Sequence, residues 1–168
     1  MHHDLLHREV TEQIIGGFYE VHYELGGGFL EHVYRSPIIE VLRGRGLLVE
    51  DNARLPVHFR GRLIAEFRPD LVINQVVLVE LKAHRAIEPA DEAQIISYLR
   101  ASNVEVGLLL NFGPNPSFKR HVYANSRKIG SGIPWYVDRL VTHLLTALSE
   151  ARSRMIPRIP RPPRLVQE

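Results

Sequence analysis

The sequence has no cysteine and no long hydrophobic run. The absence of cysteine excludes disulfides, thiolate metal sites and cysteine nucleophiles, and it fits a cytoplasmic protein. No apolar run approaches the roughly 18 residues that a membrane-spanning helix needs. The first four residues, Met-His-His-Asp, are too polar for an export signal. We therefore expect a cytoplasmic protein with no membrane contact.

The chain also has little net charge, because 21 lysines and arginines nearly balance 19 aspartates and glutamates. Residues 151–168 hold five arginines and one glutamate, so residues 1–150 carry a formal net charge of −2. The basic character belongs to the C-terminal tail. It is little evidence that the folded part of the chain binds nucleic acid.

The apolar residues follow the pattern of a globular protein. The chain has 168 residues and is 45% hydrophobic, which suits one domain with its own core. Apolar spacing of three or four predicts helices, and short runs of branched residues predict strands. Helices are expected at 5–25, 29–45, 88–101 and 134–155, and strands at 47–50, 55–59, 63–67, 70–73, 76–82, 104–111 and 120–124. These blocks favour a mixed α/β (α+β) fold with a mixed sheet and helices on its faces.

The first two predicted helices are separated by three glycines, 26–28. These glycines do not form a phosphate-binding loop, because no Lys-Ser/Thr follows and no strand precedes them. They mark a break between helices. Pro37 falls within the second predicted helix. It would either kink that helix or mark its first turn, with Ser36 as the cap.

The C-terminal residues are expected to extend a single domain over residues 1–155. An amphipathic helix at 134–155 would be its last element, and it could serve as a homodimer contact. From Pro157 the sequence reads Pro-Arg-Ile-Pro-Arg-Pro-Pro-Arg. This proline density prevents a helix and favours an extended, mobile tail over residues 156–168.

The most informative segment is residues 69–82, Pro-Asp-Leu-Val-Ile-Asn-Gln-Val-Val-Leu-Val-Glu-Leu-Lys. Asp70, Glu80 and Lys82 lie in or beside two runs that should become buried strands, where a charge is costly unless it is paired or bound to metal. Glu80 and Lys82 are two apart and share one strand face. A surface hairpin with an ordinary Glu–Lys pair is the alternative. We expect instead a divalent-metal site for phosphodiester cleavage.

The turn of this hairpin decides whether Asp70 joins the same face as Glu80. A two-residue turn at Asn74-Gln75 would pair Asp70 with Val79 and leave Glu80 facing away. A three-residue loop at 74–76 would place Asp70 opposite Glu80. The metal site requires the second register, or a bulge with the same effect.

Two carboxylates suit Mg²⁺ or Mn²⁺, which prefer oxygen ligands and keep several waters. A bound metal polarises a phosphate and lowers the pKa of its water. Lys82 could orient that water or stabilise the charge that develops on phosphorus. The main-chain carbonyl of Leu81 could supply a further ligand.

The same segment resembles the PD-(D/E)xK nuclease signature, with Pro69-Asp70, nine intervening residues and Glu80-Leu81-Lys82. Residues 28–34, Gly-Phe-Leu-Glu-His-Val-Tyr, are similar to the motif that names the GxxExxY proteins, a group within that superfamily. Further similarities to the group are Glu20-Val21-His22 with Glu24-Leu25-Gly26, Glu92-Ala93-Gln94, and Leu108 to Gly113. The resemblance covers roughly residues 8–124, and the order and spacing of its motifs are specific.

The resemblance implies a restriction-endonuclease-like core, with a mixed sheet of about four strands flanked by helices. It implies that Asp70 and Glu80 are metal ligands and that Lys82 is the catalytic lysine. Glu31 matches the extra acidic residue that many such nucleases bring to the metal. Gln94 and Tyr98 resemble the Gln-x-x-x-Tyr motif of RecB-type members and are candidates for substrate binding. Tyr34 and Arg68 are two further candidates for substrate binding.

Several of these residues, and others near them in the sequence, have a second interpretation. Tyr34 could be a core aromatic and Glu31 a surface charge. His22 could lie near the metal, as in some RecB-type nucleases, or pack in the core. Six arginines could either hold phosphates beside the site or form a solvated surface; they are Arg35, Arg60, Arg62, Arg68, Arg85 and Arg100.

We therefore predict a Mg²⁺- or Mn²⁺-dependent nuclease that hydrolyses phosphodiester bonds, in DNA rather than RNA. The alternative is a nuclease-like module that binds nucleic acid or assembles with protein without cutting. The two are distinguished by whether Asp70, Glu80 and Lys82 converge in the fold. A serine hydrolase is not expected, because no serine has a convincing His/Asp partner.

Overall fold

The computed structural model describes residues 6–128. The chain divides into two compact units, Met1–Trp135 and Tyr136–Glu168. The helix expected at 134–155 and the tail lie outside the described residues, so the single domain over 1–155 stays a prediction. The helices are α1 (Arg8–Leu25), α2 (Glu31–Gly44), α3 (Pro89–Ala101) and the 3-10 turn η2 (Asn125–Arg127); the strands are β1 (Val49–Asp51), β2 (Leu55–Phe59), β3 (Arg62–Phe67), β4 (Leu71–Ile73), β5 (Val77–Lys82), β6 (Val106–Asn111) and β7 (Ser117–Val122).

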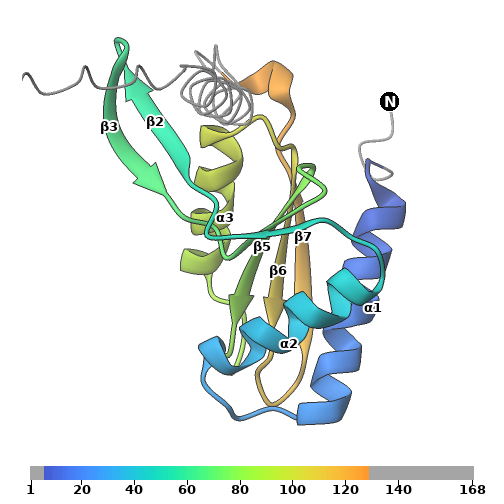
Figure 1. Cartoon of the computed structure of the whole chain (residues 1–168). Helices are drawn as coiled ribbons and strands as arrows, with labels where there is room; N and C mark the ends of the chain where they lie inside the picture. Colours follow the sequence, from blue (N-terminus) through green and yellow to red (C-terminus); the bar gives the residue numbers. More distant parts are fainter. Residues whose placement is uncertain (1–5, 129–168) are drawn as a thin grey trace, which may run out of the picture. The chain divides into compact units, whose positions relative to one another are not determined.

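Five of these strands form one sheet in the order β1-β4-β5-β6-β7, and helices flank it (Figure 1). The β5–β6 pair is parallel and the other pairs are antiparallel, so the sheet is mixed, as expected. It has one strand more than the four that the resemblance implied. Every residue of β5 and β6 is buried, because these two strands lie inside the sheet and are covered on both faces.

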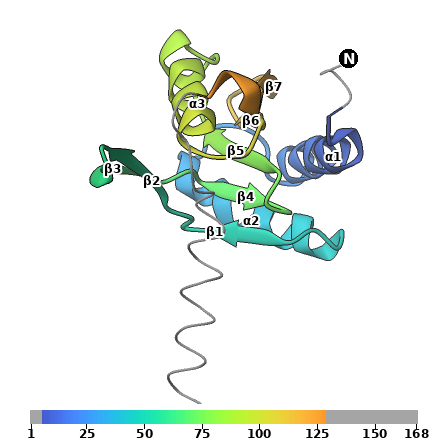
Figure 2. The same ribbon diagram turned by 90° about the horizontal axis from the view of Figure 1, so that it is seen from above.

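Helix α3 covers one face of the sheet, while α1 and α2 lie together on the other (Figure 2). The α1/α2 face holds the larger apolar cluster, in which Tyr34 stacks on Phe112 with ring centroids 4.3 Å apart. On the opposite face Gly107 lets α3 approach closely, because a Cβ there would lie 2.8 Å from Ile95 side-chain carbons. No helix among residues 6–128 is long and apolar enough to cross a membrane.

The β4–β5 hairpin adopts the register with the three-residue loop. Ile73 pairs with Val77 and Leu71 with Val79, which leaves residues 74–76 as the connection. Asn74 and Gln75 both have positive φ, at 48° and 61°. Alternate residues of the hairpin therefore pack against α1 and α2, and the residues between them face α3. This alternation directs Asp70, Glu80 and Lys82 to the α3 face.

The helix expected at 29–45 is present. Of the two alternatives for Pro37, the first-turn position is wrong, because α2 begins at Glu31, six residues earlier, and Pro37 lies inside it. The last strand begins at Ser117 rather than at residue 120. Its first residues pair with the end of β6, with Asn111 opposite Ser117. The residues at its start, Ser117, Phe118 and Lys119, are partly or largely exposed and hold a single apolar side chain, so no apolar alternation reveals them as a strand.

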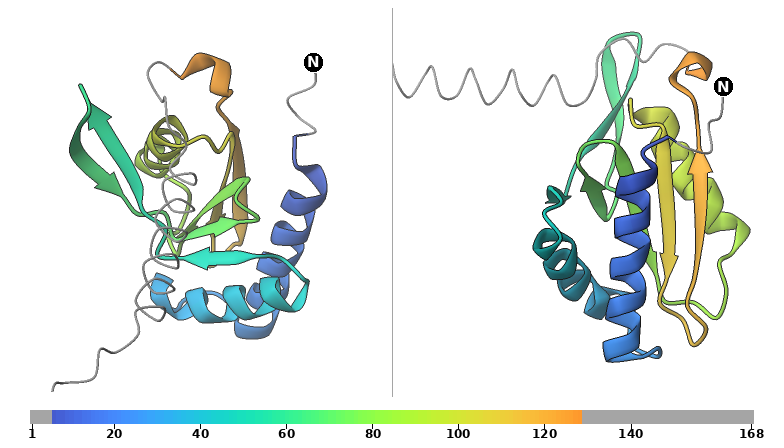
Figure 3. Two further views of the ribbon diagram at one scale, coloured as in Figure 1. Left: turned by 45° about the horizontal axis from the view of Figure 1, so that its top comes forward. Right: turned by 90° about the vertical axis from the view of Figure 1, so that its right-hand side faces the viewer.

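Strands β2 and β3 form a separate two-stranded sheet. Their turn is Arg60-Gly61, as predicted, and both residues have positive φ, which is typical of a tight hairpin turn. Both views of Figure 3 show this hairpin projecting beyond the five-stranded sheet. Its base contacts α3. We call residues 54–68 the projecting hairpin.

Candidate active site

Asp70 and Glu80 are joined across the β4–β5 hairpin by main-chain hydrogen bonds. The amide of Asp70 donates to Glu80 Oε1 at 3.1 Å, and the amide of Leu81 donates to Asp70 Oδ2 at 2.8 Å. These reciprocal bonds follow from the register, which places residue 70 opposite residue 80 at the end of the paired strands. The hairpin itself therefore positions both carboxylates.

Arg35 of α2 also binds Asp70. Its guanidinium donates from Nη1 to Asp70 Oδ1 at 2.9 Å and from Nη2 to the main-chain oxygen of Asp70 at 3.0 Å. Both side chains are partly exposed. Arg35 was one of the arginines expected to hold phosphates or lie on the surface. Its position beside Asp70 adds a cation at the edge of the site.

Glu80 is almost completely buried, with 2% of its surface exposed. Burial, together with repulsion from Asp70, raises the pKa of Glu80 to about 8. The Lys82 ammonium, with Nζ 3.7 Å from Glu80 Oε2, opposes that rise. Its charge does not cancel the cost of burial. A buried carboxylate of this kind would be stabilised by a further cation.

Lys82 is 9% exposed and continues into a chain of polar contacts along α3. Its Nζ donates to Gln94 Oε1 at 3.1 Å, and Gln94 Nε2 donates to the Tyr98 hydroxyl at 2.8 Å. Burial raises the pKa of Tyr98. Because Gln94 and Tyr98 are four apart, they share one helix face. The structure thus brings both residues of the Gln-x-x-x-Tyr pattern next to Lys82.

Glu31 stands in the first turn of α2, at the margin of this cluster. Burial raises the pKa of Glu31; the charge of Lys82 opposes the rise and that of Asp70 adds to it. A helix N-terminus also favours a carboxylate. Glu31 is therefore electrostatically coupled to the same group of residues, although no hydrogen bond of its side chain to them is present.

The structure places the other residues proposed for the site, Tyr34, Arg68 and His22, in three different surroundings. Tyr34 is fully buried, and its hydroxyl donates to the main-chain oxygen of Gly26 at 2.9 Å, so it is a core aromatic and cannot contact substrate in this conformation. Arg68 is exposed and pairs with Glu66 at 3.3 Å. His22 Nε2 lies 3.1 Å from the main-chain oxygen of Gly113, which fits the packing alternative.

Asn111 is a positioning residue to which the sequence analysis gave no role. Its side chain accepts from the main-chain amide of His84 at 2.9 Å and donates to the main-chain oxygen of His84 at 3.0 Å. It therefore holds the chain just after Lys82. The signal in the sequence was a polar residue at the end of an apolar run, inside the Leu108–Gly113 similarity, and the structure buries it completely. His84 also lies 3.7 Å from the buried Asp91 of α3.

The donor set suits a hard divalent cation, although its atoms now bond within the protein. Asp70 and Glu80 offer carboxylate oxygens. The Leu81 carbonyl points to the same side of β5 as its amide, which meets Asp70. No group of three or more His, Cys, Asp or Glu side chains in the described part of the chain is arranged to hold a metal. Arg35 and the hairpin amides occupy the carboxylate oxygens that would have to bind it.

This mixed sheet, with two carboxylates and a lysine on its central hairpin, defines the protein class. The family model of the PD-(D/E)XK nuclease superfamily matches residues 8–122. The chain belongs to that superfamily, as the hairpin motif suggested. The match covers the hairpin, α3 and both N-terminal helices.

Individual proteins give less information than the family model. No curated protein matches the chain. A solved structure described as "Crystal structure of SSO0001" is 17% identical, with a TM-score of 0.42, and the match covers 70% of this chain and 59% of that one. The chain thus spans less than two thirds of that structure.

Proposed function

We propose that the protein is a Mg²⁺- or Mn²⁺-dependent nuclease of the GxxExxY group that hydrolyses phosphodiester bonds in DNA. Membership of a nuclease superfamily supports nuclease activity. The observation that carries the proposal is the convergence of Asp70, Glu80 and Lys82 on one sheet face, with Glu80 buried. A cytoplasmic location fits the absence of cysteine.

In this proposal Asp70 and Glu80 hold the metal ion, with the Leu81 main-chain carbonyl as a further ligand and Glu31 as an added acidic residue. The bound ion would supply Lewis-acid chemistry that polarises the phosphate and lowers the pKa of water. Lys82 Nζ holds the attacking water or stabilises charge on the phosphate oxygens. Gln94 keeps Lys82 in place, and Tyr98 extends the polar surface towards the substrate.

The direct test is cleavage of single-stranded, double-stranded and branched DNA, and of RNA, with Mn²⁺ and with a chelator. We expect metal-dependent cleavage of DNA that Lys82→Ala abolishes. Circular dichroism should show that this variant stays folded. Lys119→Ala is the matched control, because that lysine lies on β7, away from the β4–β5 hairpin. Undiminished cleavage by Lys82→Ala would exclude the proposed mechanism.

A second candidate function is favoured by the ion pair between Arg35 and Asp70. If Arg35 keeps its ion pair with Asp70, that carboxylate is not available to a metal ion. The protein would then be a module that binds nucleic acid without cutting it. In that case Mn²⁺ would not raise the melting temperature of the protein, and no substrate in the panel above would be cut. A metal-induced rise that Asp70→Asn and Glu80→Gln each remove would favour the nuclease.

A further inference from the structure

The projecting hairpin keeps apolar side chains in solvent. Phe59 and Ile64 are each 60% exposed, and Leu63 is 54% exposed. Nearly every residue of β3 is exposed, since β2 and β3 pair only with each other. An isolated two-stranded hairpin is at best marginally stable in water. Phe59 and Ile64 share one face of this arm, because Phe59 pairs with Arg62, two residues before Ile64. Exposed apolar side chains on one face indicate a surface that contacts a ligand.

The same hairpin is strongly basic, whereas residues 1–150 together carry a small negative charge. Residues 54–68 contain four arginines and one acidic residue, while residues 1–150 as a whole carry a formal charge of −2. Arg54 and Arg68 share the carboxylate of Glu66, at 3.2 and 3.3 Å. Arg60 and Arg62 form no ion pair within residues 6–128. Two guanidinium groups near the tip are therefore available to phosphates.

A groove of about 360 Å³ lies between the base of the hairpin and α3. It is within the usual size range of ligand pockets, roughly 300–1,000 Å³. Its walls include Val57, Phe67, Ser97, Arg100, Ala101 and Arg127. Neither Arg100 nor Arg127 has an ion-pair partner in the part of the chain that the structure describes. The groove therefore has a mixed lining of apolar side chains, a serine and three cations. The third cation, Lys128, donates to the main-chain oxygens of Ser102 and Val104.

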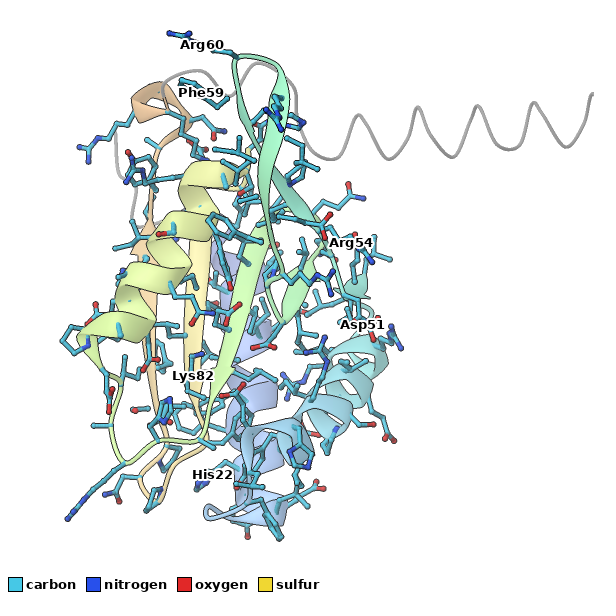
Figure 4. The ribbon with its side chains drawn as sticks, turned by 90° about the vertical axis from the view of Figure 1, so that its left-hand side faces the viewer. His22, Asp51, Arg54, Phe59, Arg60 and Lys82 are labelled. Atoms are coloured by element: carbon cyan, nitrogen blue, oxygen red, sulfur yellow. The ribbon has the colours of Figure 1, made fainter. Side chains whose placement is uncertain are left out.

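The groove connects to the candidate active site through Phe67 and Tyr98. The two rings lie 5.2 Å apart, and the Tyr98 hydroxyl accepts from Gln94, which in turn accepts from Lys82. Figure 4 shows Phe59 and Arg60 at the far end of the hairpin, Arg54 near its base and Lys82 on β5. The groove therefore lies next to the α3 residues that reach Lys82, and the hairpin extends beyond it.

We propose that the projecting hairpin and this groove bind single-stranded DNA on one side of the cleaved phosphate. The position beside the scissile bond rests on the proposed function. Unpaired bases offer exposed π faces to Phe59, whereas a duplex hides those faces and presents mainly phosphates. The guanidinium of Arg60 lies 5.2 Å from the centroid of the Phe59 ring, so charge and stacking surface are adjacent. Arg62 and Arg100 then contact the strand's phosphates.

The test measures fluorescence anisotropy of a labelled oligonucleotide, single-stranded or duplex, with the full chain and a chelator that prevents cleavage. The variants are Phe59→Ala with Arg62→Ala on the hairpin, and Arg100→Ala on α3. The matched controls are Leu48→Ala, an exposed apolar residue outside the hairpin, and Arg8→Ala on α1. Melting temperatures check that each variant is folded.

We expect the wild-type protein to prefer the single strand, and the hairpin double variant to lose about tenfold or more in affinity. Each lost arginine should lower the slope of log affinity against log salt by about 0.7. Arg8→Ala and Leu48→Ala should bind as the wild type does. The inference would be overturned if the hairpin double variant and Arg100→Ala bound the single strand as tightly as the control variants do. Preference of the wild-type protein for the duplex would overturn it as well.

Cleavage measured on the same preparations separates this inference from the proposed function. Lys82→Ala should keep the preference for the single strand and fail to cut it. A wild-type protein that binds through the hairpin but never cuts would contradict the nuclease alone. If the wild-type protein cuts DNA and the hairpin and Arg100 variants bind the single strand normally, the binding role of the hairpin is contradicted and the nuclease activity is not.

Discussion

Individual residues of the site are held by several bonds each, and this explains how charges persist in an apolar hairpin. The Asp70 side chain accepts from Arg35 and from the amide of Leu81. Glu80 accepts from the amide of Asp70 and lies beside Lys82. Burial nevertheless raises the pKa of Glu80 to about 8, because these partners do not replace the water that it lost.

This pKa predicts how stability depends on pH in the absence of metal. The unfolded pKa of Glu80 is about 4.5, so between that value and about pH 8 the folded state binds more protons than the unfolded state. The free energy of unfolding should therefore fall as pH rises through this range, by on the order of a few kcal/mol. Glu80→Gln should flatten the profile in denaturant titrations with a chelator. Glu12→Gln, on the exposed face of α1, is the control. Parallel profiles for wild type and Glu80→Gln would contradict the prediction.

At the scale of the elements, hydrogen bonds join the C-terminal ends of β5 and β6, next to Lys82. Asn111 bonds both main-chain groups of His84, and the amide of Phe112 donates to the Lys82 carbonyl at 2.6 Å. Gly113 lies against the same stretch, since a Cβ there would come 1.9 Å from the main-chain oxygen of His84. The position of Lys82 therefore depends on this junction as well as on β5.

Gly113→Ala should accordingly displace the junction. The added Cβ meets main-chain atoms that cannot rotate away, so we expect destabilisation of about 1–3 kcal/mol or more and reduced cleavage. Gly44→Ala at the end of α2 is the matched control, because nothing lies within 4 Å of its added Cβ. It should be neutral or stabilise slightly. Urea denaturation and cleavage rates measure both effects. Similar behaviour of the two variants would exclude the proposed role of Gly113.

On the scale of the whole molecule, the first compact unit, Met1–Trp135, contains the five-stranded sheet and its three helices. Its apolar cluster draws on α1, α2 and the central strands. A unit with its own core can fold by itself. The residues beyond it carry the arginine-rich tail and most of the helix that was expected as a homodimer contact.

A chain ending at Trp135 should therefore unfold cooperatively, at a melting temperature close to that of the full chain. Light scattering should show a dimer for the full chain and a monomer for the shortened one, if residues 134–155 form the dimer contact. Equal masses for the two chains would contradict that role. A shortened chain that does not fold would show instead that the first unit depends on the C-terminal residues.

The sequence by itself determined the helices, most strands and the position of the charged hairpin, because apolar periodicity and turn residues act over short stretches. Only the tertiary structure decided the three-residue loop that places Asp70 opposite Glu80, the burial of Tyr34 against Phe112, and the contact of Arg35 with Asp70. Arg35 and Asp70 are 35 residues apart. Such contacts depend on how helices pack on the sheet, and local patterns do not record that packing.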